Sequence, residues 1–152
     1  MALWSLLASP LIMGNDARKI RAASRAILLN KPAIAISQDP LGTPGVRLWP
    51  PALSRAKARH NNQDEQPREH ELWARNLTGG DVAVGLYNKG TAANTSASTF
   101  TVDLAALGFG ASATVQVFDC WAGTSAGKHR GKYTSPPVAH HDTLLLRLSR
   151  AS

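Results

Sequence analysis

The stretch Thr143-Leu144-Leu145-Leu146-Arg147-Leu148 contains three consecutive leucines, so apolar side chains fall on both faces of the strand it would form. A strand of this kind is typical of the centre of a sheet, where both faces are covered. Four further runs precede it, separated by Gly, Asn, Ser and Pro clusters: Leu72–Trp73, Val82–Tyr87, Phe100–Leu104 and Thr114–Phe118. This spacing predicts an antiparallel β-sandwich over residues 71–150.

The first 31 residues have a different pattern. Met1 to Ser9 is predicted to be a buried helix that Pro10 ends, and Leu11 to Gly14 a buried parallel strand. Asp16 is predicted to cap a second helix, whose apolar face is Ile20, Ala23, Ile27 and Leu28. Helix, strand, helix is the local order of a β/α barrel or a doubly wound sheet, and this piece cannot close either one by itself.

Two connecting stretches follow. Pro32 to Gly42 is predicted to be extended and to end in a turn, because Asp-Pro and Gly disfavour helix. Trp49 to His70 is rich in Pro, Arg, Asn, Gln and Glu and lacks an apolar period, which predicts an exposed, mobile loop. We therefore divide the chain into residues 1–42, a linker over 43–70 and a β-domain over 71–150.

Composition narrows the class of protein. The chain has 152 residues with 43% apolar and 18% charged residues, a globular composition. The net charge of +7 is compatible with a nucleic-acid partner. The sequence has no basic stripe interleaved with exposed aromatic residues, so no nucleic-acid partner is predicted. The single cysteine, Cys120, excludes an internal disulfide, and no zinc-ligand spacing occurs.

The apolar start, Met1 to Gly14, imitates a secretory signal. It lacks a preceding Lys or Arg and a clear small-x-small cleavage site, so we do not interpret it as one. It is also shorter than the roughly 20 apolar residues that span a bilayer, and no membrane span is predicted. We expect Met1 to be an internal methionine of a longer protein.

Residues 1–20 carry Met-x-Leu-Trp, a small-small-Pro-Leu run and Asp16-Ala17-Arg18. In these motifs they resemble the last barrel helix and strand of the melibiase-type alpha-galactosidases and alpha-N-acetylgalactosaminidases. Ile34-Ala-Ile-Ser-Gln-Asp-Pro-Leu-Gly42 is similar to the segment that leaves the barrel. Strands of the family's C-terminal β-domain are resembled by three stretches: Glu71–Trp73, Val82–Asn88 and Val115–Trp121. The departures are Ser37 for the usual Asn, Cys120 for a common Leu, and the long stretch 49–70.

The resemblance implies the end of a (β/α)8 barrel followed by a C-terminal antiparallel β-sandwich. It also implies a retaining hydrolase of terminal alpha-linked galactose that uses two aspartates and no metal or organic cofactor. Both aspartates of that family precede Met1, so no catalytic residue is expected in this chain. Implied substrates are oligosaccharides, glycolipids or glycoproteins, in a secreted, lysosomal or vacuolar setting. A homodimer and the choice between galactose and N-acetylgalactosamine stay open.

Several residues are candidates for a site. Asn15 and Asp16 sit where a barrel strand would end, although helix capping is the simpler role for Asp16. A glycosidase dyad of Asp16 with Asp39 would need a separation near 5 Å or a wider inverting gap, which nothing in the sequence supports. Gln38, Asp39, Pro40, Leu41 and Gly42 are assigned as structural motif residues. Asn76 and Asn94 begin glycosylation sequons.

Other conspicuous residues are given structural roles. His140-His141-Asp142 is predicted to form a turn before the last strand, and Lys128 to Lys132 a solvated loop. Trp4, Trp73 and Trp121 fit core positions, while Trp49 lies in the polar stretch. Cys120 is predicted to be a small buried hydrophobe. A non-catalytic β-sandwich that binds carbohydrate or packs on a partner is the alternative function.

Overall fold

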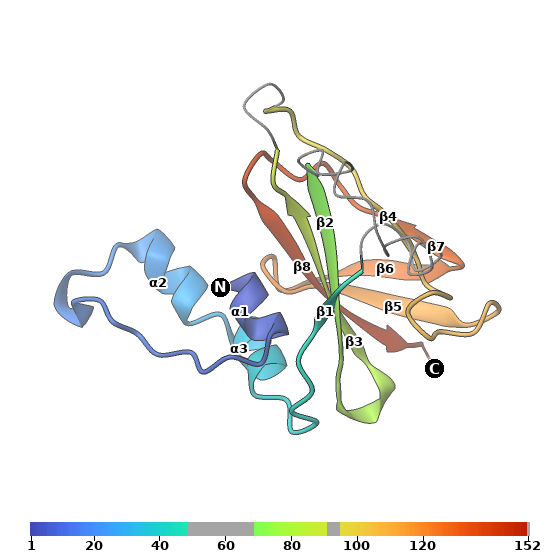
Figure 1. Cartoon of the computed structure of the whole chain (residues 1–152), viewed down its shortest axis with the longest axis horizontal. Coiled ribbons are helices and arrows are strands. Elements are labelled where there is room, and N and C mark those ends of the chain that lie inside the picture. Colours follow the sequence, from blue (N-terminus) through green and yellow to red (C-terminus); the bar gives the residue numbers. More distant parts are fainter. Residues whose placement is uncertain (49–68, 91–94, 152) are drawn as a thin grey trace, which may run out of the picture.

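The computed structural model describes residues 1–48, 69–90 and 95–151 of the chain. Within them, one antiparallel sheet of six strands runs in the order β1-β2-β3-β8-β5-β6 (Figure 1). Its strands are β1 (Val46–Arg47), β2 (His70–Asn76), β3 (Val82–Asn88), β8 (Thr143–Arg150), β5 (Thr114–Asp119) and β6 (Thr124–Arg130). The leucine-rich strand β8 lies between β3 and β5, so its predicted central position is confirmed.

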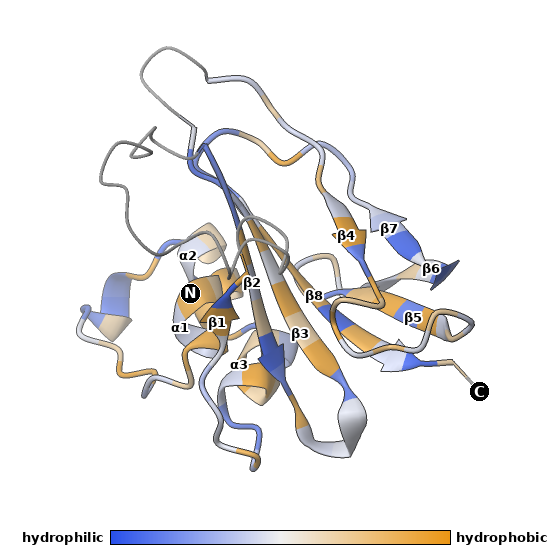
Figure 2. Cartoon of the chain, turned by 45° about the vertical axis from the view of Figure 1, so that its right-hand side comes forward, coloured by the Kyte–Doolittle hydropathy of each residue, from blue (hydrophilic) through white to orange (hydrophobic). Residues whose placement is uncertain are grey.

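A second layer covers one face of this sheet. β4 (Thr101–Asp103) and β7 (Lys132–Thr134) pair with each other and pack over the main sheet through Val102 and Tyr133. Beneath them, apolar residues run along β3, β8 and β5 (Figure 2). Members of this core are less than about a tenth exposed and include Val84, Leu86, Phe100, Val115, Val117, Leu146 and Leu148. The prediction of an antiparallel β-domain with a core between two layers is confirmed.

Helices cover the other face. α1 (Ala2–Leu6) contacts β2, β3 and β8, and α3 (Lys31–Ser37) packs beside α1 (Figure 1). A second buried cluster joins this helical layer to the sheet through Ala2, Leu6, Ala33, Ile36, Leu77, Ala83, Cys120 and Leu145. A short 3-10 helix, Ala17–Lys19, and α2 (Ala22–Leu28) complete the segment and bury no residue.

Several predictions for this segment are wrong. The first helix ends at Leu6 rather than at Pro10, and α2 is capped at Arg21, because Asp16 caps only the 3-10 helix. Leu11 to Gly14 forms no strand, because among the described residues no strand lies beside it to share hydrogen bonds. Pro32 to Gly42 is not extended, since α3 occupies Lys31–Ser37 before the turn. Asn30 caps α3 by accepting from the Ala33 N–H, and Pro32 is tolerated in the first helical turn. Asp39-Pro40 and Gly42 disfavour helix only at the end of this stretch, and the burial of Ala33 and Ile36 against the sheet stabilises the helix before them.

Further predictions fail in the β-domain and at α1. Lys128 to Lys132 is not a loop: it contains the end of β6 and the start of β7, joined at Gly131 with φ 68°. Trp4 is not in the core, because 62% of it is exposed. Trp73 and Trp121 are partly buried, and they pack against the second cluster rather than in the predicted core of the β-domain. Trp49 and most of the predicted loop 49–70 lie outside the described residues.

Leu146→Ala is expected to lower the free energy of unfolding by about 2–5 kcal/mol, because it removes a fully buried side chain from the central strand. Urea unfolding followed by circular dichroism measures this. Leu41→Ala is the matched control, since Leu41 is 48% exposed and its loss is expected to cost less than about 0.5 kcal/mol. Equal losses for the two variants would contradict the assignment of the core.

Candidate functional site at the helix–sheet junction

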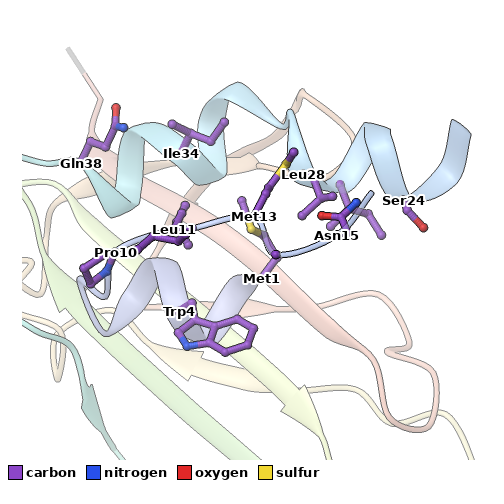
Figure 3. Close-up of a pocket in the computed structure, with 13 residues that line it drawn as sticks. Met1, Trp4, Pro10, Leu11, Met13, Asn15, Ser24, Leu28, Ile34 and Gln38 are labelled. Atoms are coloured by element: carbon purple, nitrogen blue, oxygen red, sulfur yellow. The ribbon is translucent and has the colours of Figure 1, made fainter. Parts of the chain in front are cut away.

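The helical segment encloses an apolar groove of about 780 Å³. Residues 10–15 run between α1 and the α2–α3 pair, and Leu11, Met13, Leu28 and Ile34 lie around the space between them (Figure 3). Trp4 and Ile12 also line it and are 62% and 87% exposed. Exposed apolar surface gathered in this way is typical of a face that another part of a protein covers.

The predicted rim residues are placed at different points of this groove. Asn15 lines it, as does Gln38, whereas neither Asp16 nor Asp39 does. Asp16 caps the 3-10 helix by accepting from the Arg18 N–H at 3.0 Å. The Arg18 guanidinium also donates to both Asp16 oxygens, at 2.9 and 3.0 Å, and these bonds lower the pKa of Asp16 below its usual value. Asp16 therefore acts here as an exposed, paired cap.

Asp39 has a different set of partners. Its carboxylate accepts from the Leu41 N–H and from both the N–H and the hydroxyl of Thr78, each at about 3.0 Å through Oδ1. Partial burial raises the pKa of Asp39, but these bonds and the charge of Arg75 outweigh it, so the net pKa is lowered. Because Asp16 and Asp39 each bind their own partners, the structure does not assemble them into a dyad. Pro40 and Leu41 complete the turn, and Gly42 follows it with φ 66°.

A buried arginine joins the helical layer to the sheet. Arg75 of β2 is only 1% exposed, and it binds main-chain carbonyls rather than a carboxylate. Nη1 donates to Ser5 O at 2.7 Å and to Ile36 O at 2.6 Å, while Nε donates to Thr43 O at 2.9 Å. Ser5 and Ile36 lie in the last turns of α1 and α3, whose carbonyl ends attract a cation.

Two glycines allow the backbones to approach at this junction. A Cβ on Gly45 would lie 2.8 Å from Leu6 O and 3.0 Å from Ala74 O, closer than real side chains come. The Gly45 N–H donates to the same Leu6 oxygen at 2.7 Å. A Cβ on Gly85 of β3 would lie 2.5 Å from Cδ1 of Leu6, so Leu6 packs directly on the strand. A side chain at Gly45 would require the backbone of α1 or β2 to shift, whereas one at Gly85 would require the Leu6 side chain to move.

Asn30 attaches the other end of α3. Its Oδ1 caps the helix, and its Nδ2 donates to Cys120 O at 2.8 Å. Cys120 is fully buried in the same cluster as Leu6 and Ile36, as predicted, and burial raises its pKa to about 12. The thiol is therefore protonated and shielded near neutral pH. α3 is thus attached to the sheet domain at Asn30 and, through Asp39 and Thr78, just beyond its last turn.

The remaining candidates fall outside this junction. His140 and His141 form the predicted turn, with ring centroids 3.8 Å apart. No cluster of metal-ligating side chains occurs in the described part of the chain, and no helix there is long and apolar enough to cross a membrane. Asn76 is exposed at the end of β2, and Asn94 lies outside the described residues.

Sequence reasoning missed Arg75, Asn30, Gly45 and Gly85. One signal for Arg75 was available: Glu71, Trp73 and Arg75 share one face of β2, so a charged residue repeats on a face that also carries a tryptophan. The contacts of Gly45 and Gly85 with Leu6 left no such signal in the sequence, because they depend on how α1 packs against the sheet in three dimensions.

Family models match both parts of the chain. The model described as the alpha galactosidase C-terminal beta sandwich domain matches residues 67–148, more than half of the chain, and the model described as alpha galactosidase A matches residues 1–39.

Individual proteins agree with these matches. An alpha-galactosidase of Lachancea cidri is 31% identical over 95% of this chain and 31% of its own length, and human alpha-galactosidase A is 36% identical over 72% of this chain and 21% of its own length. The crystal structure of alpha-galactosidase I from Mortierella vinacea superposes with a TM-score of 0.77 at 27% identity, covering 97% of this chain and 33% of that one. The chain thus spans about a third or less of these relatives.

Arg75→Met is expected to lower the free energy of unfolding by about 2–4 kcal/mol, because three buried or partly buried carbonyls lose a charged donor. It is also expected to make Cys120 reactive toward a thiol reagent near neutral pH, as α1 and α3 loosen over it. Arg147→Met is the control: Arg147 makes a partly exposed ion pair with Asp81 at 2.8 Å, worth less than about 1 kcal/mol. A shielded thiol and unchanged stability in Arg75→Met would show that Arg75 does not hold the layer.

Asp39 is expected to make stability depend on pH in the acid range. Its pKa is lower in the folded chain than its usual value of 3.8, so its contribution is present above that value and is lost as pH falls through the folded pKa. Asp39→Asn should therefore lose stability relative to the parent at pH about 6, and the two proteins should converge at strongly acid pH. Urea midpoints across that range measure the difference. A constant gap between the two proteins at every pH would contradict the prediction.

Proposed function

The chain belongs to the melibiase-type alpha-galactosidase family, and from this premise we propose that it is the C-terminal part of a retaining alpha-galactosidase. The observation that carries the proposal is the match of the family's β-sandwich model over residues 67–148, with a solved alpha-galactosidase that superposes on 97% of the chain. The complete enzyme would release terminal alpha-linked galactose from oligosaccharides, glycolipids or glycoproteins, through two carboxylates and without a metal or organic cofactor.

Residues 1–42 are, in this proposal, the end of the enzyme's (β/α)8 barrel. The support is the uncovered apolar groove, in which Trp4, Ile12 and Met13 are each about half exposed or more. A barrel buries such residues between its strands and its outer helices. The missing part of the barrel is the occupant that would cover the groove. The linker over residues 43–70 and the β-domain over residues 71–150 complete the proposed division.

The chain's own contribution is support rather than chemistry. Asp16 is paired with Arg18, and Asp39 with Thr78, so neither is a free carboxylate facing a sugar site. Arg75, Asn30 and Asp39 fix α1 and α3 on the sheet, and these helices carry the groove. The β-domain would thereby hold the last part of the barrel in place.

The isolated chain is expected not to hydrolyse an alpha-galactoside, since retaining hydrolysis uses two positioned carboxylates. In the described part of the chain, Asp16 and Asp39 bind separate partners and form no such pair. A fluorogenic alpha-galactoside measures turnover by the purified chain. Turnover that is lost in Asp16→Asn or Asp39→Asn would show that the catalytic groups are in this chain after all.

A chimera tests the positive side of the proposal. The chain replaces the corresponding third of the Mortierella vinacea enzyme, onto which it superposes. The chimera is expected to hydrolyse the fluorogenic alpha-galactoside. Its Arg75→Met variant is expected to lose this activity at a lower temperature when both proteins are heated before the assay. A folded chimera, judged by circular dichroism and gel filtration, that does not turn over substrate would contradict the assigned role.

A further inference from the structure

The hairpin between β2 and β3 carries a sequon that the proposed function does not use. Asn76 is the last residue of β2, and a 3-10 turn, Thr78–Gly80, leads into β3. Asn76 and Thr78 are exposed, whereas the side chain of Leu77 between them is buried, with 3% exposed. The acceptor asparagine therefore faces solvent at a tight surface turn, the setting in which an N-linked oligosaccharide is accommodated.

The hairpin lies away from the groove. It projects beside the turn after α3, on the opposite side of the layer from α2 (Figure 1). Asn76 lines neither the large groove nor the smaller cavities around Met1 and Trp121. A bulky polar group on Asn76 would leave the apolar groove and the buried clusters untouched.

The third residue of the sequon is held by another part of the chain. The Thr78 hydroxyl donates to Asp39 Oδ1 at 3.0 Å, and the Thr78 N–H donates to Oδ1 and Oδ2 of the same carboxylate at 3.0 and 3.2 Å. A sequon requires the hydroxyl at this position. In the folded chain that hydroxyl is already hydrogen-bonded to the carboxylate of Asp39, 39 residues away in sequence. The side chain of Leu77 fixes the turn by packing in the second buried cluster.

We propose that Asn76 is an acceptor of an N-linked oligosaccharide and that Asp39 closes this acceptor site once the turn after α3 has docked. The donor is an oligosaccharide on a polyprenyl diphosphate. Nδ2 of Asn76 bonds to the anomeric carbon, the bond from that carbon to the diphosphate oxygen breaks, the diphosphate leaves with the electron pair, and the amide loses one proton. The site does not depend on the proposed hydrolase activity.

Translation of the full chain behind a cleavable secretory signal, with microsomal membranes, tests the acceptor. The variant Asn94→Gln removes the second sequon, and in that background the chain is expected to gain one oligosaccharide that an endoglycosidase removes. Asn76→Gln and Thr78→Ala should each abolish this gain, while Thr78→Ser, which keeps a hydroxyl, should retain it. An unmodified Asn94→Gln chain, in membranes that modify a reference glycoprotein, would overturn the proposal.

Closure is tested on the folded chain. Unglycosylated Asn94→Gln protein, purified and native, is given the solubilised transferase and the lipid-linked donor. Its rate of modification is expected to be at least about tenfold lower than that of its Asp39→Ala variant. The reason is that the hydrogen bonds from Thr78 to the Asp39 carboxylate must open first.

Asn30→Ala is the matched control for closure, since it removes the cap at the opposite end of α3 and leaves the Asp39 and Thr78 atoms in place. This variant is expected to remain as slow as the parent. If Asn30→Ala and Asp39→Ala accelerate modification equally, or if the native parent is modified as fast as the urea-unfolded chain, Asp39 does not close the site.

Discussion

The arrangement of the helical layer depends on one buried cation. Arg75 reaches from β2 to the carbonyl ends of α1 and α3 and to Thr43 in the connection that leads to β1. Among the residues that the structure describes, no carboxylate is bonded to its guanidinium, and the partial negative charges of two helix ends and the nearby charge of Asp39 stabilise it. Burial lowers the pKa of Arg75, and Asp39 opposes that shift. Three chain segments that are distant in sequence thus meet at one side chain.

A charged residue at position 75 specifies the orientation of α1 and α3 more narrowly than an apolar residue would. An apolar side chain would tolerate α1 and α3 at many rotations, because dispersion contacts have no direction. The guanidinium fork instead requires carbonyls along fixed directions. Gly45 and Gly85 add a steric condition, since Gly45 lets the Leu6 carbonyl, and Gly85 the Leu6 side chain, approach the backbone closely. α1 is therefore held both by hydrogen bonds and by close packing at Leu6.

The sequence predicts what depends on local pattern and misses what depends on partners. The leucines of β8 identify a central strand because both of its faces are apolar. The first helix was predicted too long, because it ends at Leu6 and Ala8 has φ 55°, before Pro10 is reached. β6 was missed because an edge strand needs no apolar alternation, and its residues are mostly polar. Arg75 was missed because arginine is ordinarily exposed. α3 was missed because Asp39-Pro40 and Gly42 disfavour helix, but they lie beyond its last residue, Ser37, and Asn30 caps its start.

The helical segment divides into a part that the sheet supports and a part that it does not. Leu6 and Ile36 are at most 1% exposed, so the sides of α1 and α3 that face the sheet are buried within this chain. α2 and residues 11–14 bury no side chain fully, and Ile12, Met13 and Ile27 remain about half exposed or more. Burial of apolar area is the main source of stability, so the supported helices can stay docked while the outer part still lacks its covering layer. The sheet, through Arg75, thus presents the groove in a defined position to whatever completes it.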